Sequence, residues 1–169
     1  MYLLYFLVAV LGELLVPRRL VAAREAANLV AFAVYIAVTL LFYGLFKPVN
    51  RDVSLLAAIV SLLGSAVGIL GVFHLAPSHL SPLWFFGPYC ILLGWLILRS
   101  TFLPRILGAL LISAGVGWLA YLSPAVANVL SNWIKGLGIL AEASLMLWLV
   151  VRGVNERNWQ EQAGLKAAP

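Results

Sequence analysis

Charged side chains are scarce in this sequence. Asp, Glu, Lys and Arg together make up 10% of the 169 residues, and the mean hydropathy is +1.05. A soluble domain carries about 25% charged residues, because water must hydrate its surface. The deficit therefore excludes an ordinary soluble globular domain and favours a protein that is dissolved in lipid.

Cysteine and histidine are scarce as well, which limits metal and redox chemistry. Cys90 is the single cysteine, so the chain forms no internal disulfide and no cysteine-based metal cluster. His74 and His79 stand five residues apart with Pro77 between them, and this is not the spacing of a metal-ligand pair. We therefore expect no metal and no cofactor, and we keep His74 as a candidate ligand-binding residue.

The sequence contains instead long runs without any charge. Residues 53–98 and residues 106–134 include no Lys, Arg, Asp or Glu. A helix needs about 20 apolar residues to cross the hydrocarbon core of a bilayer. The runs are continuous and do not alternate in polarity as the strands of a membrane β-barrel do. The sequence therefore predicts an all-α, polytopic transmembrane helical bundle that contacts the lipid bilayer and has no soluble domain.

Prolines and basic residues divide the apolar runs into six predicted membrane segments. These are residues 2–16, 26–46, 53–75, 83–98, 106–122 and 133–151. The bundle then occupies residues 1–153, and residues 154–169 form a short polar cytoplasmic tail. The first segment is short and contains Glu13, so it either spans the membrane, re-enters it or is cleaved as a signal peptide. Five spans remain if it does not cross.

Basic residues are divided unequally between the two sides of this bundle. Seven fall on the side of the C-terminus: Lys47, Arg51, Arg99, Arg105, Arg152, Arg157 and Lys166. The other side has Arg18, Arg19 and Arg24. Lys and Arg accumulate in cytoplasmic loops, so we predict a cytoplasmic C-terminus in a bacterial plasma (inner) membrane. The same rule accounts for the net charge of +5 without a nucleic-acid partner.

Ionisable residues within the predicted membrane segments are Glu13, Lys135 and Glu142. A charge at the centre of a bilayer costs about 2.5–3.5 kcal/mol on insertion scales, so each of them needs a partner or a purpose. Lys135 and Glu142 are two helical turns apart, about 10 Å, which is too far for a direct bond. We therefore expect Lys135 to pair with Glu13, which lies at a similar depth, or to extend outward to the interface. Glu13 and Lys135 are also candidates for binding a ligand or a proton.

Glu142 falls near the middle of the last predicted segment, and its carboxyl group should face the interior of the bundle. Loss of hydration favours the uncharged form of a carboxyl group. Glu142 is therefore a candidate for reversible proton binding or for binding a cationic ligand; alternatively, it makes a structural hydrogen bond. Ser61, Ser65 and Ser113 offer hydroxyl partners at a similar depth.

Small residues recur at four-residue spacing on two of the predicted helices. Gly64 and Gly68 form one such step, and Ala109, Ser113 and Gly117 form another. Small residues let helices approach closely in lipid, where packing drives helix association. We interpret both stripes as helix-packing surfaces, either within one bundle or in a homodimer or larger membrane complex.

Aromatic residues cluster near the predicted outer end of the bundle. They are Trp84, Phe85, Phe86, Tyr89, Trp118 and Tyr121. Trp and Tyr are typical of the interface between membrane and water, so the cluster indicates an aromatic belt. The alternative interpretation is an aromatic-lined ligand pocket beneath the outer leaflet.

Three sequence blocks together resemble a known family. They are KPVNR at residues 47–51, LPRILG at residues 103–108, and AE at residues 141–142 running into LWLVVRG at residues 147–153. Their order and spacing resemble the bacterial membrane family catalogued as domain of unknown function 4386, over about residues 11–153. The resemblance implies a compact polytopic bundle. It assigns no activity and no catalytic residue.

Motifs that would assign chemistry are missing from the sequence. It has no phosphate loop, nucleophile elbow, haem-binding histidine pair or zinc-protease helix. We interpret the chain as a small integral membrane protein, an accessory or ligand-binding helical bundle. One alternative is a proton-coupled transporter of a small solute, working as a dimer with Glu142 as the coupling group. A second is an intramembrane enzyme acting on lipid, which would need at least two converging catalytic groups.

Overall fold

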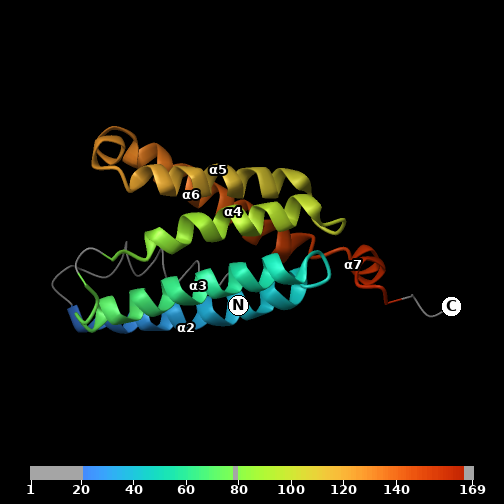
Figure 1. Ribbon diagram of the computed structural model, residues 1–169, viewed down its shortest axis with the longest axis horizontal. Helices are drawn as coiled ribbons and strands as arrows, with labels where there is room; N and C mark the ends of the chain where they lie inside the picture. The colour runs from blue at the N-terminus through green and yellow to red at the C-terminus, as the bar shows by residue number, and fades with distance from the viewer. Residues whose placement is uncertain (1–20, 78–79, 166–169) are drawn as a thin grey trace.

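The chain is an all-α helical bundle of the membrane type (Figure 1). The computed structural model describes residues 21–77 and 80–165. These residues form five long helices and one short one: α2 (Val21–Phe46), α3 (Arg51–Val72), α4 (Leu83–Arg99), α5 (Arg105–Tyr121), α6 (Pro124–Val151) and α7 (Glu156–Gln162). Each long helix packs beside the next one in the chain, α2 with α3, α3 with α4, α4 with α5, and α5 with α6.

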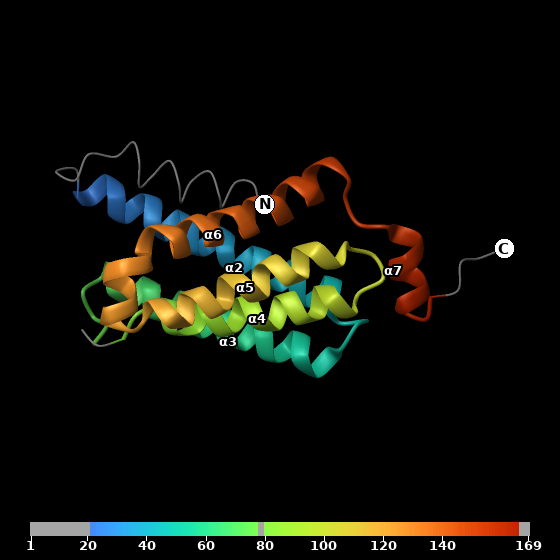
Figure 2. The same cartoon turned by 90° about the horizontal axis from the view of Figure 1, so that it is seen from above.

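The two ends of the bundle differ. α7 lies beyond the ends of the long helices, beside the turns that follow α2 and α4 (Figure 2). We call this end the α7 end. The opposite end, where α2 begins and α3 finishes, is the far end.

Three of the described helices are long and apolar enough to cross a bilayer. Their spans are Glu25–Phe46, Arg51–Val72 and Val129–Val151. α4 and α5 are equally apolar in character but have 17 residues each. A helix of that length rises about 26 Å, which is a little less than the hydrocarbon thickness of about 30 Å.

The predicted segments agree with α2 to α5 apart from a few residues at the ends. α6 differs more, because it begins at Pro124 and not at residue 133. Proline is favoured in the first turn of a helix, where its missing N–H has no partner to lose. A helix of 28 residues is about 42 Å long. α6 is therefore longer than the hydrocarbon core of about 30 Å, which was the length expected for the predicted segment. The predicted segment at residues 2–16 lies outside the described residues.

α4 and α5 form the tightest helix pair, because their glycines let the backbones meet. A Cβ atom added at Gly94 would lie 2.6 Å from the carbonyl oxygen of Gly108. A Cβ atom added at Gly115 would lie 2.7 Å from the carbonyl oxygen of Gly87. Both distances are too short for a real side chain, so the α4–α5 hairpin requires glycine at these crossings.

α2 and α3 are joined by hydroxyl groups inside the bundle. The hydroxyl oxygens of Thr39 and Ser61 are 2.7 Å apart, and both side chains are buried. Nearer the α7 end, the Ser54 hydroxyl donates to the carbonyl oxygen of Tyr43 at 3.1 Å. Such bonds between helices hold a membrane bundle together where the hydrophobic effect contributes little.

The hydrophobic core is sealed in the half of the bundle next to the α7 end. Phe46, Ile97 and Leu145 come from three different helices and are 0% exposed. Phe46 also packs its ring against Phe102, with centroids 5.7 Å apart. Only a small cavity of about 10 Å³ is found beside Phe46 in this half, whereas the two large cavities among the described residues lie toward the far end.

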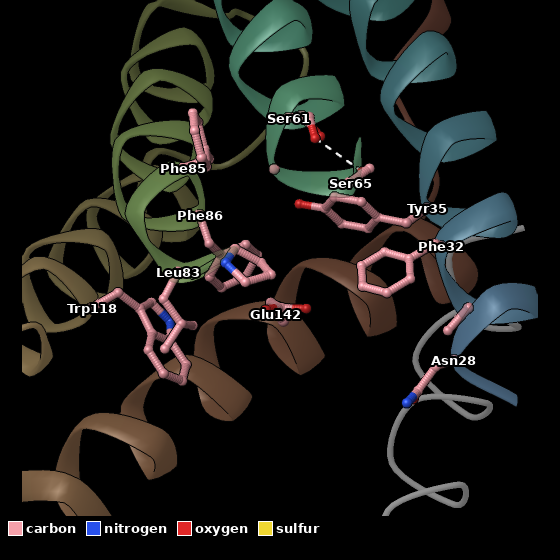
Figure 3. A pocket seen from close by; sticks show the side chains of 13 residues that line it. Asn28, Phe32, Tyr35, Ser61, Ser65, Leu83, Phe85, Phe86, Trp118 and Glu142 are labelled. Carbon is pink, nitrogen blue, oxygen red and sulfur yellow. Dashed lines mark hydrogen bonds between the residues drawn. The ribbon is translucent and has the colours of Figure 1, made fainter. Parts of the chain in front are cut away.

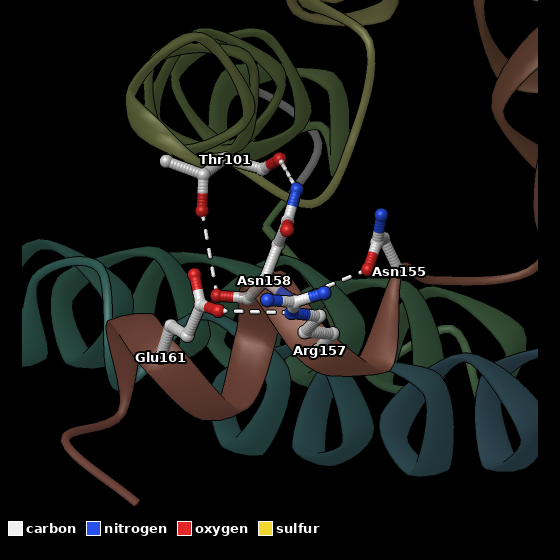
Figure 4. Close-up of polar contacts among 5 residues, drawn as sticks. All are labelled: Thr101, Asn155, Arg157, Asn158 and Glu161. Atoms are coloured by element: carbon white, nitrogen blue, oxygen red, sulfur yellow. Dashed lines mark hydrogen bonds and ion pairs between the residues drawn. The ribbon is translucent and has the colours of Figure 1, made fainter. Parts of the chain in front are cut away.

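α7 binds the turns at its end of the bundle through side chains that reach backbone carbonyl groups (Figure 4). Asn158 Nδ2 donates to the carbonyl oxygen of Thr101 at 2.9 Å. Trp159 Nε1 donates to the carbonyl oxygen of Leu45, also at 2.9 Å. Asn155 caps the helix by accepting from the backbone N–H of Asn158 at 3.2 Å. The predicted polar tail therefore contains a docked helix that the sequence pattern did not indicate.

Candidate functional site

Glu142 faces a cavity inside the bundle (Figure 3). The residue lies on α6 near the middle of the apolar span Val129–Val151, and it is half-buried. The cavity has a volume of about 330 Å³. Its lining comes from α2 to α6 and from the residue before α4: Asn28, Ala31, Phe32, Tyr35, Ser61, Gly64, Ser65, Pro82, Leu83, Phe85, Phe86, Trp118 and Glu142. The structure thus places a carboxyl group near the middle of a long apolar helix and beside a cavity.

Aromatic rings form much of the wall around this carboxyl group. Phe32 and Tyr35 come from α2, Phe86 from α4 and Trp118 from α5. Phe86 and Trp118 hold each other edge to face, with centroids 5.7 Å apart and planes at 71°. The face of an aromatic ring carries partial negative charge and attracts cations. The aromatic wall and the carboxyl group therefore both favour a positively charged ligand.

Hydroxyl groups of α3 supply the polar part of the wall. The Ser65 hydroxyl donates to the carbonyl oxygen of Ser61 at 2.9 Å, and Ser61 shares a hydrogen bond with Thr39. These bonds fix the serine side chains against α3 and α2. Neither of the ion pairs found among the described residues involves Glu142.

Of the three serines expected near Glu142, the structure places two on the wall of the same cavity and one elsewhere. Ser61 and Ser65 line the same cavity. Ser113 does not, because it lies on the exposed face of α5 and donates to the carbonyl oxygen of Ala109 at 2.9 Å. The expected pair of Glu13 and Lys135 stays a prediction, since Glu13 is outside the described residues. Lys135 is exposed, and its Nζ lies 5.7 Å from the ring centroid of Tyr121.

The small residues of α3 contact aromatic side chains of the neighbouring helices. A Cβ atom at Gly64 would lie 2.9 Å from Cβ of Phe85. One at Gly68 would overlap the ring of Phe32. Both glycines are buried, and both adjoin cavity space.

On α5 the stripe that packs within the chain is offset from the predicted one. Ala109 and Ser113 are exposed, whereas Gly108 and Gly115 meet α4. Gly117 faces α6, where a Cβ atom would lie 3.4 Å from Ile134. Ala109 and Ser113 therefore remain candidates for contacts between copies of the chain.

A second cavity lies at the far end and adjoins the first. Its volume is about 430 Å³. Asn28, Phe32 and Pro82 line both cavities. Glu25 and His74 also line it, with His74 Nε2 3.7 Å from Glu25 Oε1. The Glu25 side chain is 38% exposed and the His74 side chain is 85% exposed. His74 thus belongs to the second cavity and not to the wall around Glu142.

Sequence reasoning missed several of these lining residues. Glu25 and Asn28 stand at the start of a predicted apolar segment, where polar residues at the interface are ordinary. Tyr35 is one aromatic residue in a long apolar helix. Its spacing of seven residues from Asn28 is the one sequence signal that places both side chains on the same face of that helix. Within the described residues, no group of three His, Cys, Asp or Glu side chains could hold a metal ion.

Comparison with known proteins supports the family resemblance and adds no activity. The model of the family described as domain of unknown function (DUF4386) matches residues 76–153. This range holds the blocks at residues 103–108 and 147–153, so the resemblance is confirmed there, while the block at residues 47–51 lies outside it.

One relative is described as an uncharacterized protein of the archaeon Archaeoglobus fulgidus. It is 28% identical over 127 residues, which cover 70% of this chain and 76% of the relative. No solved structure matches the chain.

Proposed function

We propose that this chain is a membrane-embedded ligand-binding protein, and that its inner cavity takes a small lipophilic organic cation such as an amine or a quaternary ammonium ion. The observation that carries the proposal is the position of Glu142. Its carboxyl group is the only one among the described residues that line the cavity, and five of the other lining residues are aromatic.

The physical argument is one of charge compensation. A carboxylate in an apolar cavity is strongly disfavoured unless a proton or a cation neutralises it. A cation over an aromatic face gains about 0.5–2 kcal/mol for each well-placed ring. Together these contributions select a ligand that combines positive charge with apolar surface. A cavity of about 330 Å³ is at the small end of ligand pockets, which span about 300–1,000 Å³.

Orientation and location follow from the distribution of charge. The basic residues Lys47, Arg51, Arg99 and Arg105 all lie at the α7 end. The positive-inside rule favours a cytoplasmic α7 end in the plasma membrane of a prokaryotic cell, with α2 to α6 as spans. The cavity then lies in the outer half of the membrane.

Proton-coupled exchange of the cation is the second candidate, and one observation favours it. The core between Glu142 and the α7 end is sealed by Phe46, Ile97 and Leu145, so the cavity is closed on one side. Closure on one side is what one state of an alternating-access carrier requires. A lipid-modifying enzyme has less support, because the described wall of this cavity has no second carboxyl group and no histidine, lysine or arginine.

The test is a binding measurement on protein purified in detergent. Benzyltrimethylammonium serves as the probe, and benzyl alcohol serves as a neutral compound with the same ring. We expect saturable binding of the cation alone, and a loss of about tenfold or more in affinity for Glu142→Gln. Glu156→Gln, an exposed carboxylate on α7, is the matched control and should bind as the wild type does. Equal affinity of wild type and Glu142→Gln would overturn the proposal.

A further inference from the structure

The two cavities adjoin along one face of α2. Glu25, Asn28, Phe32 and Tyr35 are spaced by three, four and three residues, so they project from the same side of the helix. Glu25 and Asn28 line the second cavity, Tyr35 lines the inner one, and Asn28 and Phe32 line both. From Glu25 to Tyr35 the helix rises about 15 Å. This face therefore runs from the far end of the bundle to the chamber of Glu142.

α3 faces the same space with small residues. Ser61, Gly64 and Ser65 line the inner cavity, and Gly68 and Gly71 line the second one. Because these residues have little or no side chain, the space between α2 and α3 stays open over several helical turns. Among the large described side chains that line this space are the aromatic rings of Phe32 and Tyr35 from α2 and of Phe85 and Phe86 from α4.

Phe32 lines both cavities, and Figure 3 shows its ring on the wall of the inner one. Its ring lies directly against Gly68, since a Cβ atom there would overlap Cζ and Cε1 of the ring. Gly68 is buried, and Phe32 is half-buried. Glycine at this position is thus what allows the ring to lie across the passage between α2 and α3.

Charge along the passage is acidic. Glu25 stands at its outer rim and Glu142 at its inner end, and no Lys or Arg is among the described residues that line either cavity. Among the described residues, His74 is the titratable group found paired with Glu25. A small cation that leaves water would therefore meet a carboxylate before the aromatic partition and another behind it.

We infer that the second cavity is the entry vestibule of the inner site, that Glu25 is the first docking point for the incoming organic cation, and that the Phe32 ring is the partition between vestibule and site. This inference rests on the proposed function for the nature of the ligand. The passage itself follows from the shared lining residues and the contact of Phe32 with Gly68.

The experiment measures access to the inner cavity by a chemical reaction that does not depend on ligand affinity. In a Cys90→Ala background, Ser65→Cys places one thiol on the inner wall. The protein is reconstituted in lipid nanodiscs and treated with 2-(trimethylammonium)ethyl methanethiosulfonate, a cationic reagent. The thiolate attacks the reagent, a mixed disulfide forms and methanesulfinate leaves. Its rate reports the passage of a small cation to the inner cavity.

We expect Phe32→Ala to raise this rate by about tenfold, because the partition is removed. Phe32→Leu keeps more apolar volume and should give an intermediate rate, and it serves if the alanine variant is poorly folded. Phe85→Ala is the matched control, because Phe85 lines the inner cavity only. A rate that does not change in either Phe32 variant, or that rises equally in Phe85→Ala, would overturn the inference.

Glu25→Gln tests the docking point in the same assay. We expect it to slow the cationic reagent by roughly threefold, because the local concentration of cations falls. The neutral reagent methyl methanethiosulfonate should react at the wild-type rate, and an equal effect on both reagents would remove Glu25 from the inference.

If the rates respond as expected but benzyltrimethylammonium does not bind, the proposed function fails and the passage stands. If the ion binds but the Phe32 variants leave the rates unchanged, the passage fails alone.

Discussion

Gly94 of α4 and Gly108 of α5 meet backbone to backbone, so that a Cβ atom on either would lie 2.6 Å from the carbonyl oxygen of the other. The same arrangement recurs one contact further along at Gly87 and Gly115. This close crossing fixes α4 against α5. It thereby sets the position of Phe86 and Trp118, which these two helices contribute to the cavity.

Replacement of Gly108 by alanine should destabilise the bundle. The new methyl group would force the two backbones apart, and overpacking of this kind costs about 1–3 kcal/mol. Thermal unfolding in detergent measures the effect. Gly44→Ala is the matched control, because nothing lies within 4 Å of a Cβ atom at that helical position. A Gly108→Ala variant that is as stable as Gly44→Ala would contradict the close crossing.

Loss of the Asn158 side chain should release α7 from the bundle. The variant Asn158→Ala removes the bond from Nδ2 to the Thr101 carbonyl oxygen, and a bond of this kind contributes about 1 kcal/mol. Hydrogen exchange of the α7 amides should become faster, while exchange in α3 and α4 stays unchanged. Arg157→Ala serves as control within the same helix, since Arg157 pairs only with the exposed Glu161 among the described residues. Equal exchange rates in both variants would show that Asn158 does not hold α7.

Glu142→Leu should fold at least as stably as the wild type and should not bind benzyltrimethylammonium. Leucine removes an ionisable group from an apolar cavity, and residues kept for binding often lower stability. We expect a melting temperature that is unchanged or raised by about 2–4 °C, which corresponds to roughly 1 kcal/mol for a chain of this size. Thermal unfolding of the leucine and glutamine variants provides the comparison. A leucine variant that melts well below both the wild type and Glu142→Gln would indicate that the carboxyl group has a structural role.

Orientation can be tested by labelling single cysteines in intact cells. In the Cys90→Ala background, Leu75→Cys at the far end should react with a membrane-impermeant maleimide, because Leu75 is 71% exposed there. Lys47→Cys at the α7 end should react only after the cells are permeabilised. The reverse pattern would place α7 outside the cytoplasm.

The amino-acid sequence by itself determined the class of protein and the approximate bounds of α2 to α5. The free energy of transfer from water to lipid is a sum over residues, so uncharged runs such as residues 53–98 identify a membrane protein without knowledge of any contact. The cost of burying a charge likewise directs Glu142 toward the interior of the bundle.

The tertiary structure decided which helix faces pack and where space remains. In a helix that is apolar all round, small residues form several stripes, and spacing alone does not distinguish the exposed Ala109 and Ser113 from the packed Gly108 and Gly115. The docking of α7 could not be read from the chain either, because its partners are backbone carbonyl groups, which every residue has. The cavity exists only through the distances between helices, and those distances depend on contacts such as that of Phe32 with Gly68, between residues far apart in the sequence.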